Sequence, residues 1–429
     1  AEFLDRSEHE KLIESKNPTK NEYSNYTTYM IEGPLFIVLI DDYVLISPDQ
    51  QAIYDLIDAQ SDGAKKLYSE EYFRKIDNNL PLNKIVYFYI NFKQVNEAFF
   101  KHFAFLSEEG ISLEMLKPFL ELFDAEGAAL IATEDNFVLQ SFVSLDPDVY
   151  SDAEYLNFQD KYSGELAAYI DSKLLAYWGG ENLEYQLKRF VQLLAGNNEL
   201  SLKVFDEIVE SYTEKYFGGD VSFKEDILPL FSEEFALVLE KADEKIHYKL
   251  LVELKDSQSQ AIKIHELANS FSSVGAIFEP KIVEHILEDG SVGKEIIAVA
   301  EEIQKSESNY HGTKLYELVM GEHGGIYYAI LDNFAVISTS QDSVKSSIDL
   351  AKDPAKSLKS SAVFEKSISP VINSSDEITY FNIEGLLPLL IKAEETPNIL
   401  KIFSSLSSGR NYFNDGVVTI NYLQVKPVK

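Results

Sequence analysis

An internal repeat constrains this 429-residue chain more than any other feature. The segment IVLIDDYVLIS, which starts at Ile37, returns at Tyr328 as YAILDNFAVIS, so 328 − 37 gives a spacing of 291 positions. The similarity continues without a gap for about forty residues, which is the signature of a duplicated supersecondary unit. Identical pairs include Asp41/Asp332, Ser47/Ser338, Gln50/Gln341, Ile57/Ile348 and Phe73/Phe364. We therefore expect residues 312–425 to repeat residues 26–145.

Each copy predicts a β-hairpin followed by a helix. The two apolar runs of each hairpin are separated by Asp-Asp or Asp-Asn, and these residues tolerate the backbone conformations of a tight turn. A polar stretch follows, beginning at Ser47 in the first copy and at Ser338 in the second. Its side-chain oxygens can cap a helix, which then packs its apolar residues against the hairpin.

A further strand pattern occurs three times, at 86–91, 166–171 and 379–384. Each occurrence ends in Ile followed by an acid or an amide, and an apolar segment predicted as a helix comes next (95–103, 174–178 and 386–391). An acid or amide at such a junction favours the positive end of the helix, so we interpret these residues as caps. Closing strands at 137–145 and 417–425 complete the two modules.

The middle of the chain predicts a helix over 204–216, ended by Gly218-Gly219, and a second hairpin over 235–240 and 246–254. The expected fold class is α+β, with duplicated modules of antiparallel sheet and helices packed on the sheet faces. The predicted domains are an N-terminal tail (1–25), a first module (26–150) and a second module with a helical insert (151–429).

Charge and composition exclude several classes of function. The chain carries 38 Lys and Arg against 71 Asp and Glu, a net charge of −33, which argues against nucleic acid as a partner. It has no cysteine, which excludes disulfides, Cys-ligated metals and a thiol nucleophile. Because no apolar run reaches the length of a membrane span, we expect membrane contact only through an N-terminal anchor that this sequence, starting at Ala1, does not include.

The hairpin and helix at 329–348, the serine-rich SLKSSAVF at 357–364 and the segment DILP at 226–229 with the strand at 235–239 resemble a family. It is a bacterial exported family catalogued only as a domain of unknown function. The resemblance spans roughly 165–425, with a partial earlier unit in 26–145. It implies an extracytoplasmic location, in the periplasm or at the cell surface, and a membrane tether. It implies no catalytic residue.

Histidines and a glycine-containing segment come near known motifs without matching them. His265-Glu266-Leu-Ala-Asn269 falls one residue short of a zinc-binding HExxH helix because Asn269 replaces the second histidine, so we expect His265 to be a surface residue. His311 and His323 could meet across a hairpin and bind a metal ion. The alternative is that each only forms hydrogen bonds, as single histidines on strands usually do. The segment from Gly290 to Glu295 lacks the spacing of a phosphate loop and is predicted as a turn before a helix at 296–303.

An acidic segment is the one candidate metal site. Asp146, Asp148, Asp152 and Glu154 could offer several oxygens to Ca²⁺, although the segment lacks the glycine and the spacing of an EF-hand loop. The alternative is a solvated acidic linker between modules. No cofactor is expected.

These observations lead to a non-enzymatic, extracytoplasmic cell-envelope scaffold or binding protein whose partner is a protein or another envelope component. Two alternatives stay open. A hydrolase would need a pocket that holds two carboxylates with shifted pKa values. A carrier of apolar ligands would need a dry cavity between sheet and helices.

Overall fold

In the computed structural model the chain divides into two compact units, residues 1–74 and 75–429. The structure describes residues 6–31, 35–41, 43–62, 67–96, 122–133, 135–146, 162–195, 199–242, 245–271, 278–286, 292–300, 303–320, 324–372, 375–391, 397–413 and 415–426. The predicted boundaries at 25 and 150 do not coincide with this division.

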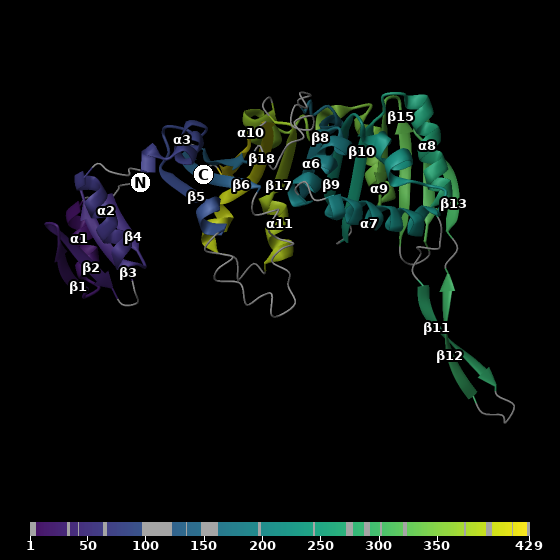
Figure 1. Cartoon of the computed structure of the whole chain (residues 1–429). Helices are drawn as coiled ribbons and strands as arrows, with labels where there is room; N and C mark the ends of the chain where they lie inside the picture. Colours follow the sequence, from purple (N-terminus) through teal and green to yellow (C-terminus); the bar gives the residue numbers. More distant parts are fainter. Residues whose placement is uncertain are drawn as a thin grey trace. The chain divides into compact units, whose positions relative to one another are not determined.

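The first unit is a four-stranded antiparallel sheet between two helices (Figure 1). Its elements are α1 (Arg6–Glu14), β1 (Thr19–Tyr23), β2 (Tyr26–Ile31), β3 (Leu35–Ile40), β4 (Tyr43–Ser47), α2 (Gln50–Asp62) and η1 (Leu67–Ser69), with α3 (Glu71–Asn78) at the unit boundary. Alternating residues of β3 face opposite sides, so Ile37 packs with Ile13 of α1 while Val38 packs with Ile53 of α2. The segment expected as a tail thus contains a helix and a paired strand.

The second unit is built on an antiparallel sheet of 13 strands in the order β13-β14-β15-β16-β10-β9-β8-β17-β18-β19-β7-β6-β5 (Figure 1). The strands are β5 (Val86–Asn91), β6 (Phe123–Ala132), β7 (Asn136–Leu145), β8 (Ala176–Glu181), β9 (Glu234–Ala242), β10 (Lys245–Glu253), β13 (Gln304–Tyr310), β14 (Thr313–Val319), β15 (Gly325–Leu331), β16 (Phe334–Ser338), β17 (Glu377–Asn382), β18 (Phe403–Phe413) and β19 (Gly416–Val425). Strands β11 (Phe278–Ile286) and β12 (Val292–Ala300) form a separate two-stranded sheet. The α+β fold class with antiparallel sheets is therefore confirmed.

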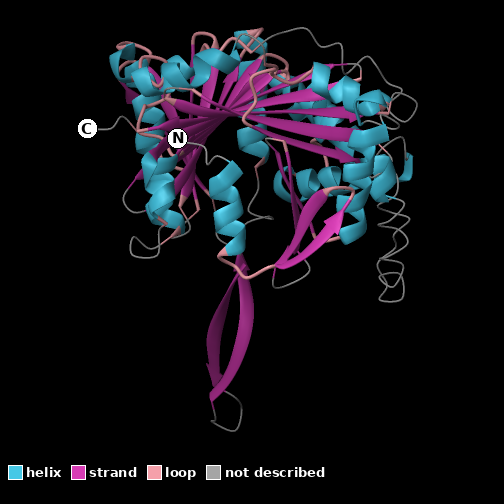
Figure 2. Cartoon of the chain, turned by 90° about the vertical axis from the view of Figure 1, so that its left-hand side faces the viewer, coloured by secondary structure: helices cyan, strands magenta, loops and turns pink. Residues whose placement is uncertain are grey.

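Helical elements lie on both sides of the long sheet (Figure 2). They are η3 (Leu166–Tyr169), α6 (Leu183–Ala195), α7 (Glu199–Phe217), η4 (Phe223–Ile227), η5 (Leu228–Phe231), α8 (Ser257–Ser270), α9 (Gln341–Leu350), η7 (Pro354–Lys356), α10 (Ala362–Ile372), α11 (Ile383–Leu390) and η8 (Asn398–Ile402). The alternation of strand residues separates two cores. Ala329 and Val336 pack with α9, α10 and η3, whereas their neighbours Tyr328 and Ala335 pack with α8 and η5. Within the described residues no helix has both the length and the apolar character needed to cross a membrane.

The last three strands of each copy, β5–β6–β7 and β17–β18–β19, share their order and register. Strands β5 and β17 start 377 − 86 = 291 positions apart, and β6 and β18 start 403 − 123 = 280 positions apart. Val86 of β5 pairs with Leu130, and the equivalent Glu377 pairs with Arg410, which is Leu130 moved by the same 280 positions. The register of both β6–β7 and β18–β19 also shifts at the equivalent point, Phe123/Ala125 and Phe403/Ser405.

The last strands of the two copies, β7 and β19, pair with each other. Gln140 lies opposite Ile420, its own equivalent at a distance of 420 − 140 = 280 positions. The six strands from β17 to β5 are thus arranged about a pseudo-twofold axis at this pair. In the second copy, β10, β9 and β8 lie between β16 and β17.

Three local predictions are wrong. Residues 166–171, expected as a strand, contain the short helix η3, and the strand β8 replaces the helix expected at 174–178. The helix expected at 296–303 is largely strand β12, which pairs with β11 along its full length. β8 is a strand because it pairs with the distant strands β9 and β17, whereas β12 pairs with its neighbour in the chain.

Candidate functional site

An apolar cavity lies between α8, the η4–η5 segment and the face of the long sheet formed by β14, β15 and β16. Its volume is about 210 Å³. The lining side chains are almost entirely apolar, and they come from six separate stretches of the chain. They include Phe217, Leu230, Phe231, Leu267, Leu318 and Ile337.

Helix α8 forms one wall of this cavity because its sequence is amphipathic and well capped. Asp256 accepts a hydrogen bond from the amide of Ser259 at 3.3 Å, which fixes the start of the helix. Ile264 and Leu267, three positions apart, are buried toward the sheet, while Ile262 on another face is half exposed. The amide of Phe271 donates to the carbonyl of Leu267 and ends the helix.

Three ring side chains form a polar border to the cavity. The imidazole Nδ1 of His265 lies 3.0 Å from the hydroxyl of Tyr328. Tyr316 stacks on Tyr328 with ring centroids 4.8 Å apart and meets His265 edge-on at 4.6 Å. His265, expected as a surface residue, is partly buried against both tyrosines.

Burial keeps His265 and Tyr328 neutral. Desolvation, helped by the nearby Lys314, lowers the pKa of His265, so the imidazole carries no charge at pH 7. Burial also raises the pKa of Tyr328 to about 12, which keeps its phenol protonated. The pair can donate and accept hydrogen bonds, but it presents no activated nucleophile.

Two solvent-open clefts share the same ring residues. One, of about 500 Å³, is lined by His265, Tyr316 and Lys314 among others. The second, of about 400 Å³, includes His265, Tyr316, Tyr328 and Lys305. An apolar space thus adjoins open polar clefts, with neutral hydrogen-bonding groups between them.

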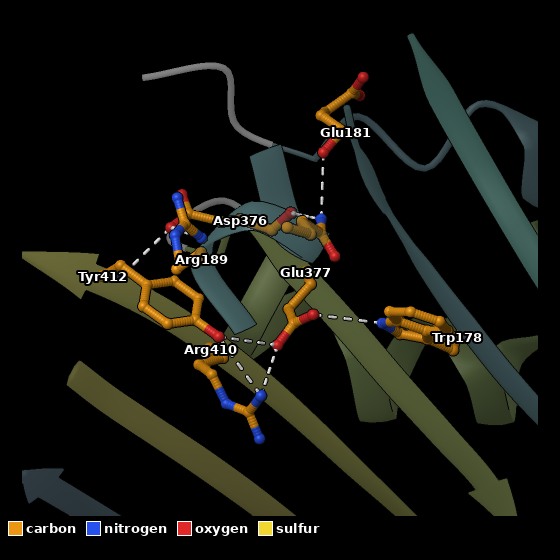
Figure 3. A network of polar contacts seen from close by, with 8 residues as sticks. Trp178, Glu181, Arg189, Asp376, Glu377, Arg410 and Tyr412 are labelled. Carbon is orange, nitrogen blue, oxygen red and sulfur yellow. Dashed lines mark hydrogen bonds and ion pairs between the residues drawn. The ribbon is translucent and has the colours of Figure 1, made fainter. Parts of the chain in front are cut away.

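A buried ionic network lies elsewhere in the same unit, around β17 and its neighbours β8 and β18 (Figure 3). Glu377 accepts hydrogen bonds from Arg410 at 2.7 Å and from the indole Nε1 of Trp178 at 3.2 Å. The guanidinium of Arg189 on α6 lies 3.8 Å from the Tyr412 ring centroid and 3.8 Å from a carboxylate oxygen of Asp376.

This network joins the sheet to α6. Arg189 is 1% exposed and Asp376 is 2% exposed, so both charges are held away from water. The carboxylate of Asp376 also accepts from the backbone amide of Tyr412 at 3.1 Å. Because these groups bind one another across four elements, we interpret the network as structural.

A second buried carboxylate belongs to Glu234 at the start of β9. It has no exposed surface and accepts hydrogen bonds from the Ser163 hydroxyl and from the amides of Glu165 and Leu166. Burial raises the pKa of Glu234 to about 7, although the three donors act in the opposite direction. Glu181 lies directly opposite it in the β8–β9 register. The carboxylate caps η3, and a substrate cannot reach it.

The acidic calcium candidate is only partly described. Asp146 forms an ion pair with Lys93 at 2.9 Å, and the same lysine contacts Asp124 at 3.0 Å. The other three candidates, Asp148, Asp152 and Glu154, lie outside the described residues, so the calcium site stays a prediction. Among the residues that the structure does describe, no cluster of three or more acids or histidines is arranged to hold a metal.

The structure describes only one of the two remaining histidine candidates, so their meeting across a hairpin stays a prediction. His311 occupies a turn with a positive φ of 51° and contacts Asp349 at 3.0 Å. His323 lies outside the described residues, as do Gly290 and Ser291 of the glycine-containing segment. The sequence did not predict this cavity, because its lining residues are spread over six stretches between Phe217 and Ile337.

Comparison with known protein families identifies the family of this chain. A family model described as "Protein of unknown function (DUF3352)" matches residues 2–275 and 294–419. The chain belongs to this family. The family resemblance expected from the sequence is thereby confirmed, and the match extends over nearly the whole chain.

Other comparisons add little. No curated protein matches the chain. Two solved structures match, crystal forms III and IV of TP0453, each at 10% sequence identity with TM-scores of 0.26 and 0.27. The matches cover 63% of this chain and 82% and 83% of the other. A similarity this low supports no inference about the fold or the site.

Proposed function

We propose that this protein is a non-enzymatic binding protein and that its ligand is an apolar group held between α8 and the sheet. The observation that carries the proposal is the cavity of about 210 Å³ with its apolar lining. An engineered apolar cavity of about 150 Å³ remains dry and binds benzene, so a space of this size accommodates an aromatic ring or a short hydrocarbon.

The neighbouring polar groups give such a ligand an orientation. Binding sites of this kind combine an apolar lining with a few polar groups that fix one end of the ligand. Here His265 and Tyr328 supply a neutral hydrogen-bonding pair, and the open clefts beyond them contain Lys305 and Lys314. A hydrocarbon with a polar or anionic end, with its apolar part in the cavity, matches this arrangement.

The carboxylates favour binding over hydrolysis. A general acid needs a raised pKa and access to the substrate. In the acidic cleft beside α8, the ion pair with Lys263 lowers the pKa of Asp226. Glu234 has a raised pKa but is sealed inside the fold.

The proposal includes a location outside the cytoplasmic membrane and a partner in the cell envelope. Its support is the resemblance to an exported family over 26–145 and 165–425. Fractionation of the native host should recover the protein with the envelope. Recovery in the cytosol would contradict this part of the proposal and leave the ligand site untouched.

The ligand site is tested by calorimetric titration with benzene and with decanoate. We expect both to bind the wild-type protein. Ala268→Phe places a ring in the cavity and should weaken binding by at least about tenfold, which corresponds to about 1.4 kcal/mol. Ile262→Phe is the matched control, because Ile262 lies on the same helix but is 54% exposed.

Two results would contradict the assignment. One is the absence of binding by either probe at millimolar concentration. The other is binding that Ala268→Phe leaves unchanged while circular dichroism shows the variant to be folded.

A further inference from the structure

The edge strand β5 leaves apolar side chains in solvent at one end of the long sheet. Among the described strands, β5 pairs with β6 alone. Ile85, Val86 and Phe88 are 50%, 55% and 53% exposed. The stretch 85–92 contains no charged residue, in a chain whose net charge is −33. An uncharged edge of this kind is a template for another strand.

The opposite edge of the same sheet is protected. Strand β13 carries Lys305 and Glu307, and nearly all its residues are exposed and polar. Charged side chains on an edge strand oppose pairing with another chain. The two ends of the sheet therefore differ in their capacity to accept a strand.

The second copy of the repeat provides a comparison for this edge. Strand β17, which is equivalent to β5, is paired on its outer side with β8 in antiparallel orientation. Thr379, the equivalent of Phe88 at 379 − 88 = 291 positions, lies opposite Trp178. Since β5–β6 and β17–β18 share their register, the outer hydrogen-bonding groups of β5 are laid out for an antiparallel partner too.

We propose that β5 pairs with β5 of a second copy of this chain, antiparallel and centred on Phe88. This pairing sets Val86 opposite Ile90 and Tyr87 opposite Tyr89, so the central cross-strand pairs are apolar or aromatic. It sets Lys84 opposite Phe92 rather than opposite another cation. Two copies with a net charge of −33 each repel each other over most of their surface. The uncharged stretch 85–92 lets two copies touch without bringing like charges together.

The interface is isologous and small. A twofold dimer uses the same surface patch on both copies. Antiparallel pairing of β5 with itself about Phe88 meets this condition. One ladder of about six residues buries less area than a permanent dimer needs, so association is weak and depends on concentration. The pairing is independent of the proposed ligand site, which lies on β14–β16 and α8.

Sedimentation velocity between about 1 and about 100 µM tests the proposal, because a small interface dissociates within this range. The dimer fraction of the wild-type protein should rise with concentration. The double variant Val86→Lys/Phe88→Lys places charges on the edge and should stay monomeric throughout. Both positions are more than half exposed, so the fold should tolerate the change.

Ile246→Lys serves as the control, because Ile246 is 50% exposed on β10, away from this edge. It should dimerise like the wild-type protein. Hydrogen exchange should also show amide protection of 86–91 rising with concentration. A wild-type protein that is monomeric at all concentrations overturns the proposal, and so does a dimer that persists in a folded Val86→Lys/Phe88→Lys variant.

Discussion

Replacing Arg189 by Met tests whether the buried ionic network holds β8, β17 and α6 together. The guanidinium is 1% exposed, lies over the ring of Tyr412 and faces Asp376, which is itself 2% exposed. Removing one partner of a buried pair leaves an uncompensated charge, which costs about 3–5 kcal/mol. With a urea m-value of about 3 kcal/mol/M, the unfolding midpoint should fall by about 1–1.7 M.

The chain supplies its own probe for this measurement. Trp178 is the only tryptophan, and its indole donates to Glu377 within the same network. Urea unfolding followed by its fluorescence therefore reports on the junction directly.

A double variant separates charge from packing. Asp376→Asn in the Arg189→Met background removes the uncompensated charge and should recover a large part of the loss. Lys188→Met is the control on the same helix, since the Lys188–Glu184 pair is solvent-exposed and such pairs contribute about 0–1 kcal/mol. If Arg189→Met shifts the midpoint no more than Lys188→Met, or if Asp376→Asn brings no recovery, the reasoning is wrong.

Two other predictions concern buried positions around β8. The pKa of Glu234 is about 7 in the folded protein and about 4.5 in the unfolded chain, so the folded state binds the proton more tightly. The protonated carboxyl therefore stabilises the fold by about 3 kcal/mol below pH 4.5, and this stabilisation is lost as the pH rises to 7. Urea midpoints at several pH values should show this slope in the wild-type protein and a flatter one in Glu234→Gln, and equal slopes would contradict it. Gly179→Ala places a Cβ 2.5 Å from the hydroxyls of Tyr162 and Tyr177 and should cost about 1–3 kcal/mol by overpacking. Thermal melts should show this loss for Gly179→Ala and almost none for Gly219→Ala, where the nearest atom is 3.8 Å away.

Local signals in the sequence predicted the elements that local chemistry determines. The hairpins β3–β4 and β15–β16 form where Asp-Asp and Asp-Asn separate apolar runs, and Asp41 adopts the positive φ that such a turn requires. Helix α7 follows its apolar spacing and ends at Phe217, before Gly218. Duplication was visible because both copies kept the same turns and caps.

Tertiary contacts decide the remaining elements. Residues 166–169 become a short helix because Glu234, 68 positions beyond Leu166, accepts the amides that such a helix leaves unpaired. Predicting this required knowledge that β9 lies beside η3. The same holds for His265, whose partners Tyr316 and Tyr328 are brought to it by β14 and β15.

The pairing of β7 with β19 has a consequence for synthesis. When a ribosome has released β5, β6 and β7, the strand that covers the outer side of Gln140 is still 280 residues away. Until β19 emerges, the nascent chain carries an open strand that can join another polypeptide, and contacts of such sequence separation form slowly. Completion of the sheet around β7 thus waits for the synthesis of β19, and a chaperone that shields β7 should raise the yield of native protein.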